Sequence, residues 1–338
     1  MGADTFGFDA LLSRQKAYNG SRIGTREMRR NMNVLDIKKV IDELTGRIDK
    51  KRLIEQAPMK EYTSFRAGGN AALLVVPESI EELKYTLKTL HEADIDYFVM
   101  GNGTNLLVKD GGYSGAIVKI GGDLADVEVS GDRIRAEAGA LLSVVAGKAL
   151  EHCLTGFEFA AGIPGSLGGA VFMNAGAYDG EMSRVVESVL VIARDGSREY
   201  TLGSEDMQYG YRSSVLMNNG DLAVRATLKL NHGEYDSIAA RMKELSDKRN
   251  TKQPLKYPSA GSFFKRPGGC FAGKLIQDAN LKGLAVGGAR VSPLHAGFII
   301  NEGGATASDI INLMKVVQNT VYDKFGIMLE PEVRIIGD

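Results

Sequence analysis

"AGIPGSLGGAVFMNAGAYDGE", residues 161–181, is the stretch of this chain whose backbone most needs an explanation. Glycines at positions 162, 165, 168 and 169 allow the main chain to lie flat against a planar or phosphorylated ligand. A loop of this length inside a compact domain is usually functional. Its many backbone polar groups also need a ligand or tight turns as partners. We therefore expect a ligand-binding loop, and a plain Gly-rich connector is the less favoured interpretation.

A second Gly-rich stretch, "VMGNGTNLLVKDGG" at residues 99–112, follows a short apolar run that reads as a strand. The backbone N–H groups around Gly101 and Gly103 are suited to form a concave nest for a pyrophosphate. It is not a Rossmann fingerprint, because Leu106 stands where the third glycine should open a helix and no helical pattern follows. Taken alone, a structural turn explains this loop about as well as a phosphate site does.

The bulk composition excludes several classes of protein. The chain has 338 residues, 44% of them hydrophobic, and a formal net charge of −1, so we expect two or three domains and no nucleic-acid or membrane surface. Cys153 and Cys270 are too few for a disulfide framework and lack metal-ligand spacing, so we expect no metal and a reducing compartment. The longest apolar runs are too short to span a bilayer, and no signal peptide is recognisable. We predict a cytoplasmic protein that acts on small molecules.

Hydrophobic periodicity predicts mixed α and β structure. The helix at 79–93 should begin with a capping box of Ser79 and Glu82, and Gly326 should close a long C-terminal helix. Two hairpins should turn at 130–132 and at Asp195-Gly196. The predicted helices are 32–44, 79–93, 141–154, 234–250, 271–279 and 308–325, and the predicted strands are 71–77, 97–100, 116–120, 126–130, 133–138, 185–202 (a hairpin), 222–230, 296–301 and 329–336.

Ser262 lies in "YPSAGSFFKRPGG", residues 257–269, and allows three interpretations. A hydrolase nucleophile would need a G-x-S-x-G elbow and a histidine base, and the stretch has no such elbow. A hydroxyl that bonds nearby turn backbone is the ordinary structural role. The third role is proton donation to a carbanion or enolate, which needs no basic partner because the carbanion is itself a strong base. The residues alone leave the last two open.

Three further polar residues have both a bland and a functional interpretation. Arg212 in "YGYRSS" is either a surface arginine or a two-pronged clamp for a carboxylate or phosphate. Glu332 alternates with apolar residues on the terminal strand, a pattern typical of a solvated face. His295 precedes an apolar strand and fits a structural histidine equally well.

Seven stretches in order along the chain resemble the UDP-N-acetylenolpyruvoylglucosamine reductase family. They are "YTSFRAGGNA", "MGNGTNLLVKDGGYSGAIV", "AGIPGSLGGAVFMNAGAYDGEM", "YGYRSSV", "SAGSFFKRP", "GGARVSPLHAGFIINEGGATASDI" and "LEPEVRIIG". They cover the chain from about residue 60 to its end. The short separation of Arg212 and Ser262 is similar to that in the shorter, type II variant, which lacks an inserted tyrosine-bearing loop, and leaves the groups that hold the substrate diphosphate undefined.

The resemblance implies an α+β protein with the FAD-binding fold of the vanillyl-alcohol oxidase (PCMH) type and a C-terminal substrate-binding α+β domain. The expected divisions are a flexible extension at 1–31, a first FAD-binding subdomain at 32–115 joined by a C-terminal strand at 328–338, a second subdomain at 116–231, and a substrate-binding domain at 232–327.

The resemblance also implies a site and a reaction. NADPH would reduce a non-covalent FAD, and the flavin would pass hydride to an enolpyruvyl nucleotide sugar in peptidoglycan synthesis. Arg212 and a protonated Glu332 would stabilise the resulting anion, and Ser262 would protonate its carbon. Substrate contacts would come from Tyr211, Lys265, Lys274 and His295. Cofactor contacts would come from Ser64, Phe65, Arg66, Gly101, Asn102, Gly103, Thr104, Asn105, Leu106, Ala161, Gly162, Pro164, Gly165, Gly168, Gly169, Asn174 and Ala177.

Two other functions stay open at this point. An oxidase or dehydrogenase of the same FAD fold would share the Gly-rich loops but would not explain Arg212, Ser262 and Glu332 together. A nucleotide-binding module without catalysis would use the loops as a phosphate cradle and would be colourless. The expected partners are small molecules, and the expected assembly is a monomer.

Overall fold

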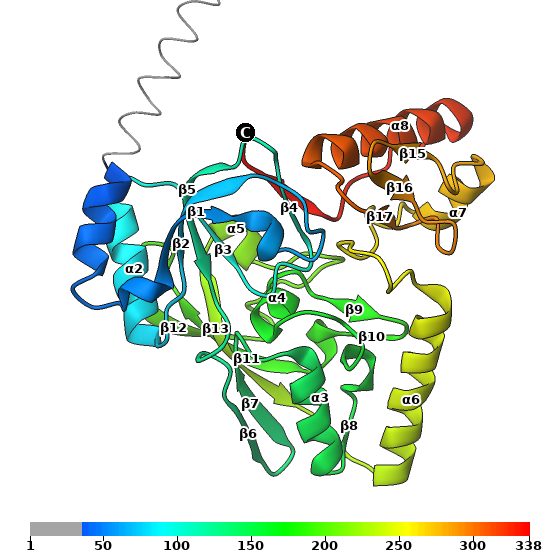
Figure 1. The fold of residues 1–338 in the computed structure, drawn as a ribbon. Coiled ribbons are helices and arrows are strands. Elements are labelled where there is room, and N and C mark those ends of the chain that lie inside the picture. The colour runs from blue at the N-terminus through cyan, green and yellow to red at the C-terminus, as the bar shows by residue number, and fades with distance from the viewer. Residues whose placement is uncertain (1–35) are drawn as a thin grey trace, which may run out of the picture.

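The computed structural model describes residues 36–338 and is drawn in Figure 1. The flexible extension predicted for 1–31 lies outside these residues. Residues 36–44 are helical, and Ile37, Val40 and Leu44 among them are buried against the first sheet. None of the helices in residues 36–338 combines the length and the hydropathy that crossing a bilayer requires.

The first sheet has four strands in the order β1-β2-β5-β3. Its elements are β1 (Leu53–Pro58), β2 (Asn70–Val75), helix α2 (Ile80–Glu92), β3 (Tyr97–Met100) and β5 (Tyr113–Lys119), with 3₁₀ turns η1 (Lys50–Arg52) and η2 (Met59–Glu61). β5 pairs in parallel with both β2 and β3. Leu83, Leu87 and Leu90 form the fully buried stripe of α2, as its periodicity predicted. β3 therefore delivers the Gly101 loop to the carboxyl edge of the parallel strands, where ligands bind in such sheets.

The second sheet has five antiparallel strands in the order β12-β11-β13-β7-β6. Its strands are β6 (Val127–Ser130), β7 (Arg133–Glu137), β11 (Val186–Ile192), β12 (Glu199–Gly203) and β13 (Leu222–Lys229), and α5 (Leu216–Asn219) precedes β13. Both predicted hairpins are confirmed, with Gly131 and Gly196 at positive φ in their turns. Helix α3 (Leu142–Glu151) packs on β6, β7 and β8 (Leu154–Thr155).

Residues 161–181 are more ordered than the sequence predicted. They hold helix α4 (Leu167–Phe172), a small hairpin of β9 (Gly176–Ala177) and β10 (Gly180–Glu181), and lead into η4 (Met182–Arg184). η3 (Glu158–Ala160) precedes them. The sequence predicted a loop throughout this stretch, which was wrong at Leu167–Phe172, because α4 forms there despite Gly168 and Gly169. A Cβ at Gly168 would stand 2.7 Å from the Cβ of Ala138, so glycine allows α4 to pack directly on the end of β7.

The third part of the chain is a smaller cluster at the right of Figure 1. It contains α7 (Ala272–Asp278), the antiparallel sheet β15 (Ala285–Val286), β16 (Ala289–Val291) and β17 (Ile299–Asn301), and the long helix α8 (Ala307–Phe325). Gly326 closes α8 at φ 70°, as predicted. A capping box of Thr306 and Asp309 opens it, and sequence reasoning missed that signal. Helix α6 (Tyr235–Lys252) follows β14 (Asn231–His232). It packs on α3, η3 and β8 rather than on this cluster.

The end of the chain returns to the first part. β18 (Arg334–Ile336) pairs in parallel with β4 (Leu106–Val108), directly after the Gly101 loop (Figure 1). The strand is shorter than the predicted 329–336, although Leu329 and Val333 are buried as expected. The Ser79 cap of α2 is present, but Glu82 accepts from the N–H of Glu78 rather than closing the box on Ser79. The predicted domain boundaries stay predictions.

Candidate active site

The two Gly-rich loops, far apart in sequence, lie against each other. A Cβ at Gly101 would stand 2.2 Å from the Oγ of Ser166, and a Cβ at Gly165 would stand 3.5 Å from the Oγ1 of Thr104. Gly103 has φ +66°, and a Cβ there would meet the carbonyl of Tyr62. A side chain at Gly101 or Gly103 would therefore separate the loops or strain the backbone, whereas the Gly165 distance is an ordinary van der Waals contact. Both loops open into one cavity.

This first cavity, the cofactor cavity, has a volume of about 560 Å³. Its walls come from both sheets, α4 and the C-terminal segment. It includes nine of the residues predicted to hold a cofactor: Gly101, Asn102, Gly103, Thr104, Asn105, Leu106, Gly165, Gly168 and Gly169. Apolar side chains including Phe98, Leu142, Phe172 and Met173 complete it, so the cavity joins backbone-rich loops to surfaces suited to a flat ring.

Two observations indicate that the cofactor cavity fits a nucleotide-bearing flavin. The Oγ of Ser166 is buried at the first residue before α4 and has no hydrogen-bond partner within residues 36–338. A buried hydroxyl left unpaired is costly, so a polar group of a ligand would relieve it. The guanidinium of Arg334 lies 5.4 and 5.2 Å from the rings of Phe98 and Phe172. No carboxylate within residues 36–338 forms an ion pair with it. Burial lowers the pKa of Arg334. An anion bound in this cavity would offset that cost.

A second cavity, the substrate cavity, has a volume of about 500 Å³. It is lined by three of the four predicted substrate residues, Tyr211, Lys274 and His295, and by Ser262. Further walls are Phe264, Arg266, Phe271, Ala272, Gly273, Gln277, Leu294, Ala296 and Gly297. Arg212 and Glu332 line both cavities, so they form the boundary between them.

Each of the three guanidinium nitrogens of Arg212 donates one hydrogen bond within the protein. Its Nε donates to Glu332 Oε1 at 2.9 Å, its Nη2 to the carbonyl of Gly176 at 3.0 Å, and its Nη1 to the carbonyl of Asn174 at 3.4 Å. The ring of Tyr211 lies 5.2 Å from the guanidinium carbon. Arg212 itself adopts φ +52°, a strained conformation that functional sites often retain. Of its five N–H donors, the three bonds leave two for a ligand.

Glu332 is a buried carboxyl group beside the guanidinium of Arg212. Its side chain is 14% exposed. Burial raises its pKa, and the nearby charges of Arg212 and Lys265 only partly oppose that rise. Its backbone is fixed on both sides, because its N–H donates to the carbonyl of Phe263 and its carbonyl accepts from Asn105 Nδ2. A carboxyl group that resists ionisation can donate a hydrogen bond or a proton.

Ser262 is exposed on the wall of the substrate cavity between two tied segments. It forms an isolated bridge with Phe298, and the N–H of Phe263 donates to the carbonyl of Gly297. Phe264 forms a second bridge with Pro331, next to Glu332. Gly261 turns the chain at φ +77°. Within residues 36–338 the Oγ of Ser262 has no hydrogen-bond partner, so it is available to a ligand in the substrate cavity.

His295 is a neutral group in the same cavity. Its Nδ1 accepts from the N–H of Gly297 at 3.1 Å, which leaves Nε2 as the protonated nitrogen of the neutral ring. Burial and the charge of Lys282 lower its pKa. Its ring meets that of Phe298 edge to face at 4.9 Å. His295 can therefore present an N–H donor without adding charge.

The comparisons with known proteins agree with this arrangement. A family model described as UDP-N-acetylenolpyruvoylglucosamine reductase, C-terminal domain, matches residues 253–336, and one described as FAD binding domain matches residues 71–200. The UDP-N-acetylenolpyruvoylglucosamine reductase of Clostridium perfringens strain SM101 is 52% identical over 281 residues, which cover 83% of this chain and 92% of that protein. The chain belongs to the UDP-N-acetylenolpyruvoylglucosamine reductase family.

Two further relatives give the same result. The UDP-N-acetylenolpyruvoylglucosamine reductase of Clostridium botulinum strain Hall is 51% identical over 281 residues, covering 83% of this chain and 91% of that protein. The crystal structure of the reductase from Thermus caldophilus is 37% identical, covers 85% of this chain and 99% of that one, and superposes with a TM-score of 0.74. The predicted family and the predicted α+β, FAD-binding fold are confirmed, and the chain is an oxidoreductase.

In this reductase, the other predicted cofactor residues do not line the cofactor cavity. Ser64 donates to the carbonyl of Ser259, and Phe65 is buried against Phe263. Asn174 is buried, with its amide bonded to the carbonyl of Gly210. The cavity walls likewise lack Arg66, Ala161, Gly162, Pro164 and Ala177, so the cofactor contacts of these eight residues stay predictions.

Lys265 and two residues that sequence reasoning missed complete the reductase site. Lys265 was predicted to contact substrate, but it lines the cofactor cavity and lies 3.4 Å from Glu330. Ser166 was overlooked although it is the serine before "LGGAVF", a position typical of a helix N-cap. Arg334 was given no role from the sequence, because no sequence signal places it between two aromatic rings.

Proposed function

We propose that the protein catalyses the NADPH-dependent reduction of UDP-N-acetylglucosamine enolpyruvate to UDP-N-acetylmuramate, a step in peptidoglycan precursor synthesis. The observation that carries the proposal is the Arg212–Glu332 pair on the boundary of the two cavities, with Ser262 on the substrate side. Membership of the reductase family supports the substrate and the use of FAD.

The substrate explains why these groups are needed. Its vinyl double bond is conjugated to a carboxylate, and the chemistry supplied by bound FAD is hydride transfer from NADPH to the terminal vinyl carbon. The electron pair of the double bond then moves to the adjacent carbon and its carboxylate. This negative charge has to be stabilised before a proton arrives.

Arg212 and Glu332 are suited to stabilise that charge. The two N–H donors of Arg212 that remain free can pair with the two oxygens of the carboxylate. Glu332, with its raised pKa, can stay protonated and donate a hydrogen bond instead of repelling the anion. Donors held in place before the reaction contribute about 3 kcal/mol each to such a step.

Ser262 would then give its hydroxyl proton to the carbon that bears the charge. A serine suits this step because it is small and uncharged, and the carbanion is basic enough to take its proton. The serine oxygen would recover a proton from solvent. The net change is one hydride and one proton added across the double bond, with NADPH oxidised to NADP⁺.

Cationic and neutral donors around the substrate cavity would hold the nucleotide sugar. Lys274, which also pairs with Asp278 at 2.7 Å, and Arg266 can meet the diphosphate, and His295 can donate from Nε2. Tyr211 accepts from the backbone N–H of Arg266 and so ties this wall to Arg212. These contacts would replace those of the inserted loop that the shorter variant lacks.

An anaerobic absorbance experiment tests the proposal. We expect the flavin colour of the holoenzyme to bleach on addition of NADPH and to return on addition of UDP-N-acetylglucosamine enolpyruvate. Bleaching without recovery would favour an oxidase or dehydrogenase with another electron acceptor. A protein that holds no flavin after reconstitution would contradict the proposal outright.

We further propose a cytoplasmic enzyme with small-molecule partners. Cys153 and Cys270 are both unpaired, which suits a reducing compartment. Size-exclusion chromatography of the holoenzyme with light scattering would test the expected monomer.

A further inference from the structure

A small hairpin, β9–β10 at residues 176–181, connects the guanidinium of Arg212 to helix α6. Its inner strand begins at Gly176, whose carbonyl accepts from Arg212 Nη2, and the preceding Asn174 carbonyl accepts from Nη1. Its tip, Tyr178 and Asp179, reaches α6 on the other side. The hairpin therefore links the proposed anion-stabilising group, Arg212, to α6, a helix that lines neither the cofactor cavity nor the substrate cavity.

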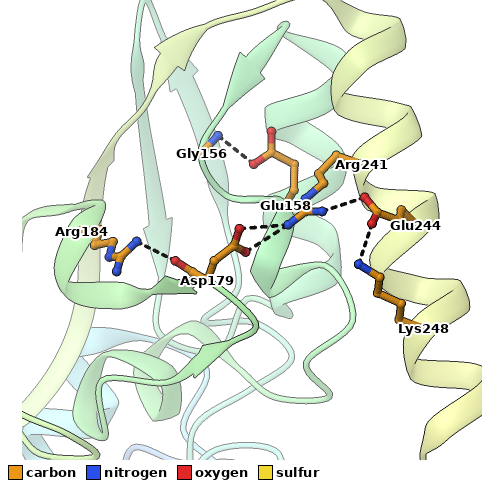
Figure 2. A network of polar contacts seen from close by, with 7 residues as sticks. All are labelled: Gly156, Glu158, Asp179, Arg184, Arg241, Glu244 and Lys248. Carbon is orange, nitrogen blue, oxygen red and sulfur yellow. Dashed lines mark hydrogen bonds and ion pairs between the residues drawn. The ribbon is translucent and has the colours of Figure 1, made fainter.

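The tip is attached to α6 by three hydrogen bonds, and Figure 2 shows the two that Asp179 makes with Arg241. Both carboxylate oxygens of Asp179 accept from Arg241 Nη2, at 3.0 and 3.1 Å, and the hydroxyl of Tyr178 donates to the carbonyl of Leu245 at 3.1 Å. Arg241 is itself oriented by Glu244, at 2.6 Å. The tip is thus held by one side chain and by the helix backbone.

The hairpin has little freedom to shift if this attachment is kept. Arg184 Nη1 donates to the carbonyl of Asp179 at 2.6 Å, as Figure 2 shows. A Cβ at Gly180 would stand 2.4 Å from the ring of Phe159, so the second strand lies flat on that ring. Tyr178 adopts φ +57° in the turn, a conformation that its surroundings must maintain. Movement at the tip would consequently be passed to Gly176.

We propose that Asp179, Arg241 and Tyr178 are positioning residues for Arg212. Their contacts with α6 hold the carbonyls of Asn174 and Gly176 where the guanidinium can face Glu332 and the substrate together. The inference rests on the proposed function, because it concerns the step in which Arg212 stabilises the anion. Arg212 lines both cavities, whereas none of these three residues lines either of them.

The exposure of the ion pair separates this role from a structural one. Asp179 is 76% exposed and Arg241 36%, and exposed pairs contribute little to folding. Loss of the pair should therefore leave the melting temperature nearly unchanged. A displacement of about 1 Å at a reacting group can lower a rate by as much as 100-fold. A rate effect without a stability effect would mark a positioning role.

The ionisation of Glu332 provides an independent readout. Arg212 lowers the pKa of Glu332 against the effect of burial, so a less well held guanidinium should let that pKa rise. Lys265 also faces Glu332, and Arg266, Lys274 and His295 line the same substrate cavity. Because these groups are unchanged in the variants, an upward shift of the alkaline limb of the rate would come from Arg212.

The experiment compares holoenzyme variants Asp179→Asn, Arg241→Gln and Tyr178→Phe. Each is reduced with dithionite, so that the result does not depend on the natural hydride donor, and reoxidation by UDP-N-acetylglucosamine enolpyruvate is followed across pH. The matched control is Glu187→Gln, because Glu187 pairs with Arg133 at 2.7 and 2.8 Å on the second sheet, also at the surface. The exchanged pair Asp179→Arg/Arg241→Asp tests rescue.

We expect reoxidation to slow about tenfold in the hairpin variants. The alkaline limb should move to higher pH, and the exchanged pair should recover at least part of the rate. Rates and pH profiles equal to those of Glu187→Gln would overturn the inference. If the wild-type reduced enzyme is not reoxidised by this substrate, the proposed function fails instead, so the two failures are distinguishable.

Discussion

Arg212 and Glu332 lie 120 residues apart in the chain, and their side chains meet at 2.9 Å on the boundary between two cavities. The pairing is unusual because burial still raises the pKa of Glu332 despite the adjacent guanidinium. An ordinary buried ion pair would favour the carboxylate. The proposed function uses this arrangement as one permanent cation and one carboxyl group whose raised pKa favours retention of its proton beside a developing anion.

Replacement of Glu332 by glutamine tests the need for that proton. The amide keeps a hydrogen-bond donor toward the substrate but can neither carry nor release a proton. We expect the rate of reoxidation of the reduced enzyme to fall about 100-fold. The proposed function uses the protonated form of Glu332, so wild-type activity should decline as pH rises through its raised pKa, and the variant should lack that limb. An unchanged pH profile in the variant would assign the limb to another group.

Ser262→Ala separates the two half-reactions. The hydroxyl is exposed only on the substrate side, so reduction of the flavin by NADPH should run at the wild-type rate. Reoxidation by the enolpyruvyl substrate should slow by a factor of about 10² or more, because the carbanion loses its proton donor. Ser259→Ala is the control, since the side chain of Ser259 lines neither cavity. Normal rates in both half-reactions would remove Ser262 from the mechanism.

The sequence predicted local structure well where turn and cap chemistry is explicit. Asp195-Gly196 and Gly326 have φ requirements that few residues other than glycine meet, and both elements are confirmed. Helix α4 was missed because two glycines weaken helix propensity, and its stability comes from packing on the second sheet instead. The capping box predicted for Ser79 and Glu82 is only half formed. The Ser79 side chain caps the helix, but the Glu82 carboxylate accepts from the backbone N–H of Glu78.

The site itself could be predicted only as a set of residues. Resemblance to the family indicated Arg212, Ser262 and Glu332, but nothing in their spacing says that the side chains of Arg212 and Glu332 meet. That contact depends on β18 returning beside β4, a long-range pairing with no local signal. Arg334 shows the same limit, because its aromatic neighbours come from β3 and α4.

Arg212→Lys should be poorly tolerated although it keeps the charge. Lysine has a single ammonium group, which cannot reach Glu332, Gly176 and a substrate carboxylate together. We expect reoxidation to slow about 100-fold while flavin content is retained. Because the lysine charge would lie elsewhere, the alkaline limb set by Glu332 should also move. A variant within about twofold of wild type would show that charge alone is sufficient.

Asp110→Asn should weaken the attachment of α8 to the first part of the fold. Asp110 accepts from the N–H groups of Ala307 and Ser308, both at 2.8 Å, and from the Ser308 hydroxyl. Burial alone would raise the pKa of Asp110, but these hydrogen bonds hold it below its usual value. The carboxylate thus adds stability above the unfolded-state pKa, about 3.9, and loses it as pH falls through the lower folded-state pKa.

Denaturant unfolding at pH 7 and pH 3 would measure this effect. At pH 7 the variant should lose about 1 kcal/mol or less, the range for a helix cap discounted for solvent screening of an exposed group. The difference should shrink at the lower pH. Equal differences at both pH values would show that the charge of Asp110 has no part in the cap.

Arg334→Met should lower the reduction potential of the bound flavin. Arg334 brings a positive charge into the cofactor cavity between Phe98 and Phe172, two residues along the chain from Glu332. Flavin becomes more negative on reduction, so a nearby cation favours the reduced form. For this two-electron couple, each tenfold preference that is lost lowers the potential by about 30 mV. Dye-equilibrated redox titration of the holoenzyme measures it.

Arg334→Lys is the matched variant, because it keeps the charge and loses the planar stacking surface. We expect it to retain most of the wild-type potential while binding FAD less tightly. If Arg334 pairs with the pyrophosphate instead, Arg334→Met should weaken binding of oxidised and reduced FAD equally and leave the potential unchanged. The potential and the dissociation constant of FAD together therefore decide which part of the cofactor Arg334 faces, since only differential affinity for the two redox states can shift a potential.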